Sequence, residues 1–375
     1  MTTTTQRFTA LDVFRGMTIC FMIIVNTPGN GATTYSPLLH ARWHGFTPTD
    51  LVFPSFLFAV GNAMSFVMPK WEKLSQNQVL WKILKRTLII FLLGYLMYWF
   101  PFVKRDVAGN FISFPFEDTR VFGVLQRIAL CYGIASLVVY YCKPKTAVIL
   151  SVIFLLGYWL LLYVFGNSID PYDMQTNAGS QLDRWLLGEK HLYHGEGVAF
   201  DPEGLLSTMP AIVNVIAGYL VGKYIQQKGT TYEGLTILLL AGVALIFAAW
   251  CWNFSFPVNK KLWTSSFVLL TVGLDCILIA AIIYIINFKH KTSWTYFFEV
   301  MGRNPLFIYL LSELAAILLW FFKVDSKTAF YQWIYNNIFS HAGSYMGSFL
   351  FALCFMLLCW LIGFIMDKRK IYIRV

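Results

Sequence analysis

The sequence predicts an all-α membrane protein built as a polytopic bundle of about ten transmembrane helices. Hydrophobic residues make up 58% of the 375 positions and charged residues only 13%, whereas about 25% of residues are charged in soluble domains. The apolar residues gather into runs of about 20, the length that a helix needs to cross a hydrocarbon core. Basic residues are concentrated in alternate connections between these runs. These three observations indicate that the lipid bilayer is the main partner of the chain.

Ten apolar runs are long enough to be transmembrane helices. They lie near 9–27, 49–69, 82–101, 120–142, 146–166, 205–225, 235–252, 262–287, 297–322 and 342–366. An even number of spans places both termini on the same side of the membrane.

The distribution of Lys and Arg predicts the orientation of these spans. The two ends of the chain and the connections on their side carry seventeen basic residues, among them Arg7 and Arg374, against ten in the opposite connections. Basic loops are retained on the cytoplasmic side of a membrane. We therefore expect both termini in the cytoplasm. The net charge of +10 is explained by the orientation of the spans and does not indicate binding to nucleic acid.

A single domain is expected over 1–375, because no repeat, low-complexity tract or separate soluble segment interrupts the spans. The longest outer connection, about 167–204, is rich in acidic residues and long enough to act as a lid or a binding surface. Asp12 and Arg15 interrupt the first apolar run, so a cleaved signal peptide is not expected. The seven cysteines lie within or at the ends of apolar runs, which predicts neither a disulfide nor a metal site.

The stretch 40–61 leads directly from polar, reactive side chains into an apolar span. An imidazole titrates near neutral pH, so His40 is a candidate base or nucleophile. Asn26 lies at the outer end of the first span and Asp50 at the outer start of the second. A base, an amide that could stabilise an oxyanion and a carboxylate that could orient the base are the parts of an acyl-transfer site. His44 is a rival imidazole four residues away, and spacing does not choose between the two.

Other polar residues enter spans at the same outer level. Asp201 and Glu203 are candidate contacts for a cationic acceptor, or simply carboxylates that favour a helix start. Trp43 and His44 in the outer loop, with Trp263 and Ser265 at the start of the eighth span, are further candidate acceptor contacts. The alternative for Ser265 is a hydrogen bond within its own helix.

Basic residues at the inner ends of spans could bind the phosphates of a cytosolic donor. Arg86 enters the third span, and Arg303 with Asn304 enters the ninth. Arg127 lies within the fourth span and is a further candidate for the donor site, because charged groups inside spans normally face a cavity or a partner. For Arg127 and Arg303 the alternative is a structural ion pair, and positive-inside anchoring explains Arg86 equally well. Neither a Walker motif nor a dinucleotide-binding glycine fingerprint occurs, which disfavours ATP or NAD as the donor.

Seven motifs together resemble the heparan-α-glucosaminide N-acetyltransferase family and its bacterial relatives. They are L-D-V-F-R-G-M at 11–17, V-N at 25–26, H-A-R-W-H-G-F-T-P-T-D-L-V-F-P at 40–54, R-V-F-G-V-L-Q-R-I-A at 120–129, D-P-E-G-L-L-S-T at 201–208, L-W-T-S-S-F at 262–267 and G-R-N-P-L at 302–306. Because these motifs run from the first span to the ninth, the resemblance covers nearly the whole set of spans.

The resemblance implies an acetyltransferase that uses cytosolic acetyl-CoA and acetylates the amine of an amino sugar on the far side of the membrane. It assigns the essential histidine to His40 and a functional asparagine to Asn26. Family members commonly have W-N-G where this chain has Trp43, His44 and Gly45, which leaves open whether His40 acts alone. Lysosomal members have a long luminal N-terminal region and an additional span, so the chain is similar to the shorter bacterial members and is expected in a bacterial cytoplasmic membrane.

Two other functions compete with amine acetylation. An O-acyltransferase that modifies a hydroxyl of a periplasmic glycan would use the same architecture. A sugar transporter would place Arg127, Asp275 and Glu313 on a substrate path, but the densest polar motif lies at one face. An acetylated His40 and direct transfer with His40 as general base are both compatible with the sequence. The exact sugar and a homodimeric assembly are left open.

Overall fold

The computed structural model describes residues 8–106, 109–229, 231–325 and 327–373. Arg7 and Arg374, which contribute to the predicted orientation, and the first residues of the expected uncleaved start lie outside these ranges.

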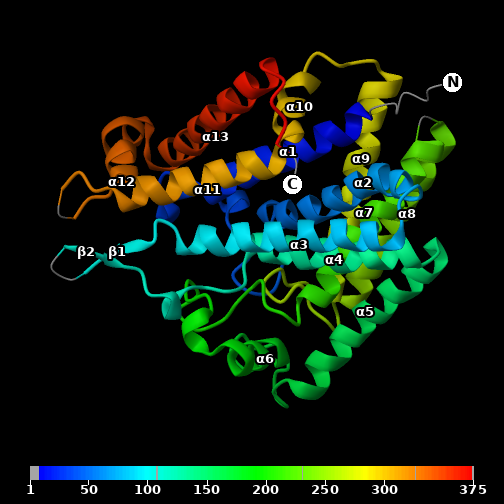
Figure 1. Cartoon of the computed structure of the whole chain (residues 1–375), viewed down its shortest axis with the longest axis horizontal. Helices are drawn as coiled ribbons and strands as arrows, with labels where there is room; N and C mark the ends of the chain where they lie inside the picture. The colour runs from blue at the N-terminus through cyan, green and yellow to red at the C-terminus, as the bar shows by residue number, and fades with distance from the viewer. Residues whose placement is uncertain (1–7, 107–108, 230, 326, 374–375) are drawn as a thin grey trace.

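The described chain is mostly helical, which confirms the predicted all-α bundle (Figure 1). Its long helices match the ten expected spans. They are α1 (Thr9–Asn26), α2 (Val52–Trp71), α3 (Gln76–Trp99), α4 (Val124–Tyr141), α5 (Pro144–Phe165), α7 (Thr208–Lys228), α8 (Tyr232–Trp252), α9 (Ser265–Ile283), α10 (Thr295–Arg303) with α11 (Pro305–Phe321), and α13 (Ser344–Lys368).

The shorter elements lie in connections. Strands β1 (Val103–Arg105) and β2 (Phe111–Ser113) form an antiparallel hairpin after α3, with Val103 opposite Ser113. Helix α6 (Ala178–Leu187) lies in the long connection expected at about 167–204, and α12 (Phe330–Ile334) precedes α13.

Within the described residues, eight helices are long and apolar enough to cross a membrane, and the count is nine if α10 and α11 form one bent span. Their axes differ by 81° at Asn304, directly before Pro305. A proline favours the first turn of a helix and disfavours helical geometry in the preceding residue, which explains the break. Helix α3 corresponds to the third expected span and is not among these nine. Lys82, Lys85 and Arg86 lie in its first half, so its uninterrupted apolar stretch is shorter than its 24 residues.

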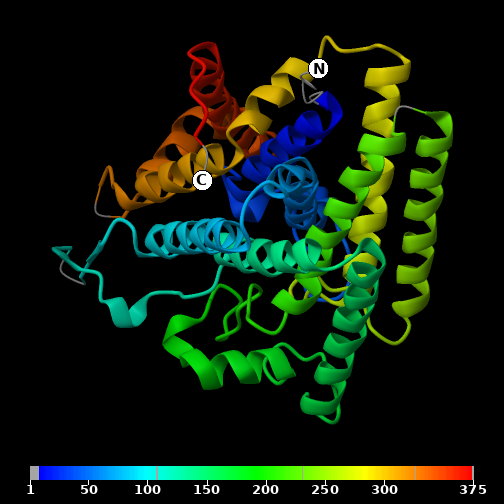
Figure 2. The same ribbon diagram turned by 45° about the vertical axis from the view of Figure 1, so that its right-hand side comes forward.

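Helices α1 to α4 lie between two flanking groups, α5 to α9 on one side and α10 to α13 on the other (Figure 2). Glycines allow the closest crossings. A Cβ atom on Gly61 of α2 would lie 1.9 Å from the carbonyl oxygen of Val215 in α7, and one on Gly16 of α1 would lie 1.8 Å from that of Phe298 in α10. Small residues of this kind let helix backbones approach closely in membrane proteins.

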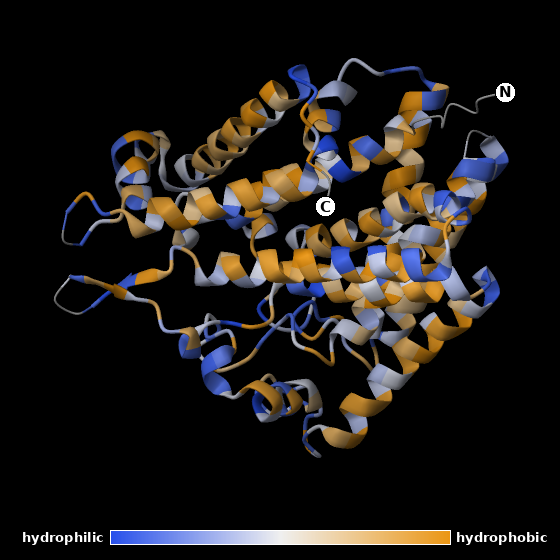
Figure 3. Ribbon diagram, viewed as in Figure 1, coloured by the Kyte–Doolittle hydropathy of each residue, from blue (hydrophilic) through white to orange (hydrophobic). Residues whose placement is uncertain are grey.

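The outward faces of α5 and α8 are lined by large apolar side chains, including Leu160, Phe165, Leu240 and Phe247. Figure 3 shows α5 as predominantly hydrophobic. In water such surfaces would be strongly unfavourable. We therefore assign them to contact with lipid.

The start of α1 and the C-terminal tail lie at the same end of the bundle. Gly302 at the end of α10 packs against the backbone of Asp12 in α1. Asn304, the next residue but one, hydrogen-bonds the backbone of Ile371 and Ile373 in the tail. Both ends of the described chain therefore meet at one face, as an even number of crossings requires.

Candidate active site

The loop between α1 and α2 holds His40 against Asp50. Asp50 is completely buried and lies within the short 3₁₀ turn Pro48–Leu51. Its Oδ2 accepts hydrogen bonds from the backbone N–H of Thr47 at 2.9 Å, from the Thr47 hydroxyl at 3.0 Å and from the Ala41 N–H at 3.2 Å. Its Oδ1 lies 2.7 Å from Nδ1 of His40. These bonds fix the carboxylate and leave one oxygen for the imidazole.

The contact with Asp50 determines which nitrogen of His40 is available as a base. The Nδ1–H donates to Oδ1 of Asp50, so Nε2 carries the free lone pair. The His40 side chain is 40% exposed, while Asp50 is 0% exposed. Partial burial lowers the pKa of His40 below its usual 6.5, the Asp50 hydrogen bond opposes this shift, and the charge of Lys260 adds to it. A neutral imidazole near pH 7 can accept a proton from a nucleophile.

Lys260 was not among the residues predicted for the site. It comes from the connection between α8 and α9, and its Nζ lies 3.0 Å from Nε2 and 3.3 Å from Nδ1 of His40. The neighbouring Lys261 donates to Glu196 at 2.7 Å and to the carbonyl of Arg42 at 2.9 Å. Lys260 and Lys261 are exceptions to the positive-inside pattern, because they lie in a connection predicted to be on the outer side. This exception is the signal in the sequence that could have identified them.

His44 and Trp43 have different partners. Nδ1 of His44 lies 3.4 Å from the side-chain amide of Asn259, and the imidazole is exposed. Trp43 donates from its indole to the carbonyl of Tyr172 at 3.2 Å and packs edge to face on Phe200. Only His40 of the two histidines is bound to a carboxylate, so the structure favours His40 as the base.

Asn26 was expected to stabilise an oxyanion beside His40. Its described side-chain partner is instead Glu313 of α11, which accepts a 3.1 Å hydrogen bond from Nδ2. The contact joins the outer end of α1 to α11 and leaves the predicted role beside His40 without support from the geometry.

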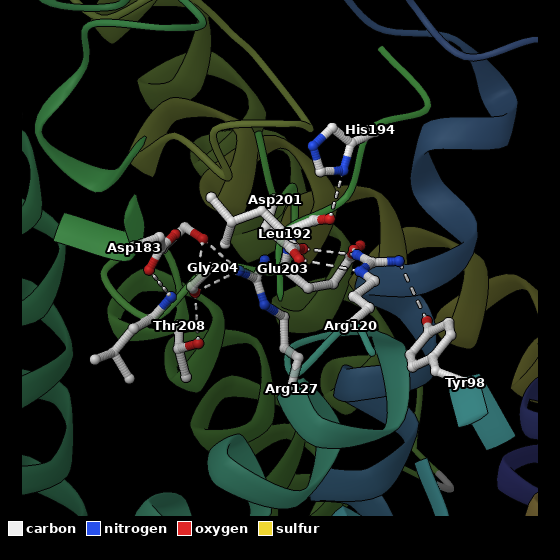
Figure 4. A network of polar contacts seen from close by, with 12 residues as sticks. Tyr98, Arg120, Arg127, Asp183, Leu192, His194, Asp201, Glu203, Gly204 and Thr208 are labelled. Atoms are coloured by element: carbon white, nitrogen blue, oxygen red, sulfur yellow. Dashed lines mark hydrogen bonds and ion pairs between the residues drawn. The ribbon is translucent and has the colours of Figure 1, made fainter. Parts of the chain in front are cut away.

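Asp201 and Glu203 are paired with Arg120 rather than free for an acceptor (Figure 4). Two guanidinium nitrogens of Arg120 contact Asp201 at 2.6 and 3.0 Å, and one of them also contacts Glu203 at 2.7 Å. The same guanidinium lies over the rings of Tyr98 and Tyr193, with centroids at 5.0 and 4.7 Å. Arg127 and Lys260 also lie within electrostatic range of Glu203, so the negative charge of the two buried carboxylates is balanced by neighbouring basic groups.

Arg127 lies in this outer cluster and does not reach the inner end of the bundle. Its guanidinium donates to the carbonyl of Gly204 at 3.0 Å and to the Ser207 hydroxyl, and it lies 4.9 Å from the centroid of the Trp263 ring. The side chain is fully buried. The expected contact between Arg127 and a cytosolic donor is therefore not supported by its position.

Trp263 and Ser265 are core residues. The Trp263 indole donates to Asn214 at 3.1 Å, and the Ser265 hydroxyl donates to the carbonyl of Leu155 in α5 at 2.7 Å. Both are 0% exposed. Their predicted contact with an acceptor does not fit these positions, because the polar atoms are used to join helices.

A large cavity opens at the other end of the bundle. Its volume is about 790 Å³, and it lies among the first turns of α1, the second half of α2, α3 and the start of α11. Four basic residues line it, namely Arg15, Lys70, Arg86 and Arg303, together with one acidic residue, Asp12. An anionic ligand with an apolar part fits this lining.

The predicted donor residues have unequal access to the cavity. Arg303 lines it but pairs with Asp367 and with Glu299, the latter at 2.9 Å. The Asn304 amide is occupied by the tail backbone, so it supports the cavity wall without facing a ligand. Arg86 lines the cavity with its guanidinium 4.6 Å from the centroid of the Tyr132 ring.

Asn62 is a cavity residue that the sequence did not single out. It is buried and lines the cavity, and both polar atoms of its side chain are without a described hydrogen-bond partner. Buried amides are normally paired. Asn62 is therefore available to a polar group of a ligand in this cavity.

Comparison with known proteins agrees with the motifs. The model of the family described as heparan-alpha-glucosaminide N-acetyltransferase, catalytic, matches residues 7–174, which include the His40 loop. The heparan-alpha-glucosaminide N-acetyltransferase of Homo sapiens is 28% identical, with 82% of this chain and 53% of that protein covered. The protein of the same name from Mus musculus is 27% identical with the same coverage. The chain spans about half the length of these curated relatives. Within that span, it is similar to the heparan-α-glucosaminide N-acetyltransferases, in agreement with its motifs.

Proposed function

We propose that the chain is a transmembrane acetyltransferase that takes an acetyl group from cytosolic acetyl-CoA and transfers it to the amine of an amino sugar on the outer, periplasmic side. The observation that carries the proposal is the His40–Asp50 pair at 2.7 Å, in a loop that the family model matches. This pair fixes the tautomer of a base, and it lies in the 40–54 motif that carries the resemblance.

The basic cavity supplies the donor site in this proposal. Its lining includes Phe8 to Arg15 at the start of α1, whereas the His40 loop follows the far end of the same helix. Arg15 and Asn26 are eleven residues apart, or about 16 Å along the helix axis. Phosphate groups held by Arg86 and Arg303 would leave the flexible arm of acetyl-CoA to extend through the bundle toward His40.

The proposed reaction is aminolysis of a thioester. The amine attacks the acetyl carbonyl, a carbon–nitrogen bond forms, and the carbonyl electrons move to oxygen. His40 accepts the proton that the nitrogen releases. The intermediate then collapses, the carbon–sulfur bond breaks, and CoA leaves as its thiolate. We favour direct transfer over an acetylated His40, because one site that holds both substrates needs no covalent intermediate.

The decisive experiment supplies purified protein with acetyl-CoA and a panel of amino sugars, and follows free CoA and product mass. The expected result is CoA release that requires an amino sugar, with a product that gains one acetyl group and resists mild alkali. A product that is lost in mild alkali would instead indicate an O-acyltransferase. Sugar uptake into vesicles without acetyl-CoA would indicate a transporter.

A second measurement separates the two routes of transfer. The protein is exposed briefly to acetyl-CoA without acceptor, digested and analysed by mass spectrometry. An acetylated peptide that contains His40 would establish a covalent intermediate. Direct transfer predicts an unmodified peptide and no CoA release until the acceptor is added.

A further inference from the structure

The lysine beside His40 is held in place by a loop that packs against the His40 loop. The backbone N–H of Gly45 donates to the carbonyl of Val258 at 2.8 Å, which joins the two loops. Asn259 is completely buried and accepts from the backbone N–H of Leu262 at 2.9 Å. Its own N–H donates to the Thr264 hydroxyl at 3.0 Å. Lys260 follows directly, so the start of its side chain is fixed by neighbours on both sides.

The contact of Lys260 with His40 differs from an ordinary surface ion pair. Its Nζ lies within 3.3 Å of both imidazole nitrogens, while Lys261 is paired with a carboxylate at 2.7 Å. An ammonium group can donate to the lone pair of a neutral imidazole but is repelled by an imidazolium ion. Burial lowers the pKa of Lys260 below its usual 10.5, and the charges of Glu203 and Asp50 oppose this shift. An ammonium group at this position is compatible with the neutral histidine and opposes the imidazolium ion.

We propose that Lys260 is a positioning residue that keeps His40 in its neutral, proton-accepting form. The inference rests on the proposed acetyl transfer for its catalytic consequence, but the Lys260–His40 relationship stands on geometry alone. The charge next to Nε2 also disfavours an acceptor that arrives as an ammonium ion. It therefore favours the free amine, which is the nucleophilic form. The amine nitrogen replaces Nζ at Nε2 when the proton is transferred.

Three charged groups act on the imidazole from the elements packed around it. Asp50, on the same loop, favours the imidazolium form, while Lys260 and Lys261, on the connection between α8 and α9, oppose it. Removal of Lys260 would leave Asp50 as the dominant charge. The pKa of His40 is then expected to rise, by about 0.5 to 1 pH unit for a partly exposed group.

The test measures the protonation of His40 without any acetyl transfer. Diethyl pyrocarbonate modifies neutral imidazoles, so the pH at which the rate of modification is half-maximal reports the pKa. Trypsin cleaves after Arg42, which separates the peptide of His40 from that of His44 and allows each to be followed by mass spectrometry. The variants are Lys260→Met, Lys260→Arg and, as a matched control from the same loop, Lys261→Met.

The proposal predicts that Lys260→Met moves the half-maximal pH of His40 upward by about 0.5 to 1 unit. Lys260→Arg should restore the wild-type value, since it keeps the charge. Lys261→Met should move the half-maximal pH of His40 in the same direction but by less, since the charge of Lys261 is paired with Glu196. The half-maximal pH of the His44 peptide should stay at its wild-type value in all variants. An unchanged His40 value in folded Lys260→Met protein would overturn the proposal, and so would failure of Lys260→Arg to restore it.

Enzyme kinetics then distinguishes this inference from the proposed function. If acetyl transfer is found, the acidic limb of kcat/KM against pH should move upward in Lys260→Met by the same amount as the modification profile. Transfer by the wild-type protein without any shift in either profile would refute the role of Lys260 only. A shift in the modification profile of a protein that transfers no acetyl group to any amine would refute the proposed function only.

Discussion

Asp50 accepts a 2.7 Å hydrogen bond from Nδ1 of His40, and the carboxylate is buried while the imidazole reaches solvent. The relationship fixes the ring and directs Nε2 away from Asp50. It also predicts the effect of Asp50→Asn, which preserves size but removes the charge. An asparagine amide that donates to Nδ1 would select the opposite tautomer and place a proton on Nε2.

We therefore expect Asp50→Asn to lower kcat by about 10²-fold or more, which is the usual scale for loss of a proton acceptor. The KM for acetyl-CoA should stay near the wild-type value, because the donor cavity lies at the other end of α1. The measurement is steady-state kinetics with saturating acceptor. Full activity would contradict a role for this carboxylate in orienting His40.

The two histidines of the loop make a matched pair for mutation. His40 contacts Asp50 and Lys260, whereas the side-chain partner of His44 is Asn259. His40→Ala should abolish turnover while the protein still binds CoA, and His44→Ala should retain most of it. Product formation and CoA binding are measured on both. An inactive His44→Ala beside an active His40→Ala would move the base to His44.

Apolar runs predicted the positions of the spans because a bilayer demands about 20 apolar residues at each crossing. Proximity of His40 and Asp50 was also predictable, since ten residues of one short loop separate them. Lys260 was not predictable in the same way, because it is 220 positions from His40 in sequence. The buried position of Ser265 was not predictable for another reason. A polar residue at a helix start faces either water or a neighbouring helix, and only packing decides which.

The proposed donor cavity offers a second matched pair of residues for mutation. Arg86 lines the cavity, while Lys85 precedes it on α3 and is exposed. If Arg86 binds a phosphate of acetyl-CoA, Arg86→Ala loses a charge-assisted contact of about 1.5 to 3 kcal/mol. The donor KM should then rise by about 10-fold or more. Lys85→Ala should leave it unchanged. Equal changes in donor and acceptor KM would argue for a general structural effect of Arg86.

Membrane orientation can be tested with single cysteines in a background without the seven native ones. Ile169 is 93% exposed in the expected outer connection, and Gln227 is exposed at the end of α7. Ser180, in the same outer connection, is buried and bonded to Asn177, so Ile169 is the better position. An impermeant thiol reagent should label Ile169→Cys in intact cells and should label Gln227→Cys only after lysis. The reverse pattern would place the donor cavity outside.

Asp183 predicts a pH dependence of stability. This residue of α6 is buried, and Oδ1 accepts from the backbone N–H of Leu205 at 3.0 Å. Burial raises the pKa of its carboxyl from 3.8 to about 6, against that hydrogen bond. The folded protein thus binds the proton more tightly than the unfolded chain does. The stabilising contribution is complete below pH 3.8 and is lost as the pH rises through 6, at a cost of up to about 3 kcal/mol.

Asp183→Asn removes this titration and can keep the bond to Leu205 through Oδ1. Its apparent Tm relative to wild type should therefore increase from pH 4.5 to pH 7.5, as measured by thermal unfolding in detergent. Asp173→Asn is the control, and its Tm should lie below that of wild type by a nearly constant amount over the same pH range. The hydroxyl and backbone N–H of Thr176 hydrogen-bond Asp173 and lower its pKa, so its carboxylate stabilises the fold above its usual pKa. A difference in Tm for Asp183→Asn that does not vary with pH would show that the carboxyl is ionised in both the folded and the unfolded state over this range, and that burial does not raise its pKa.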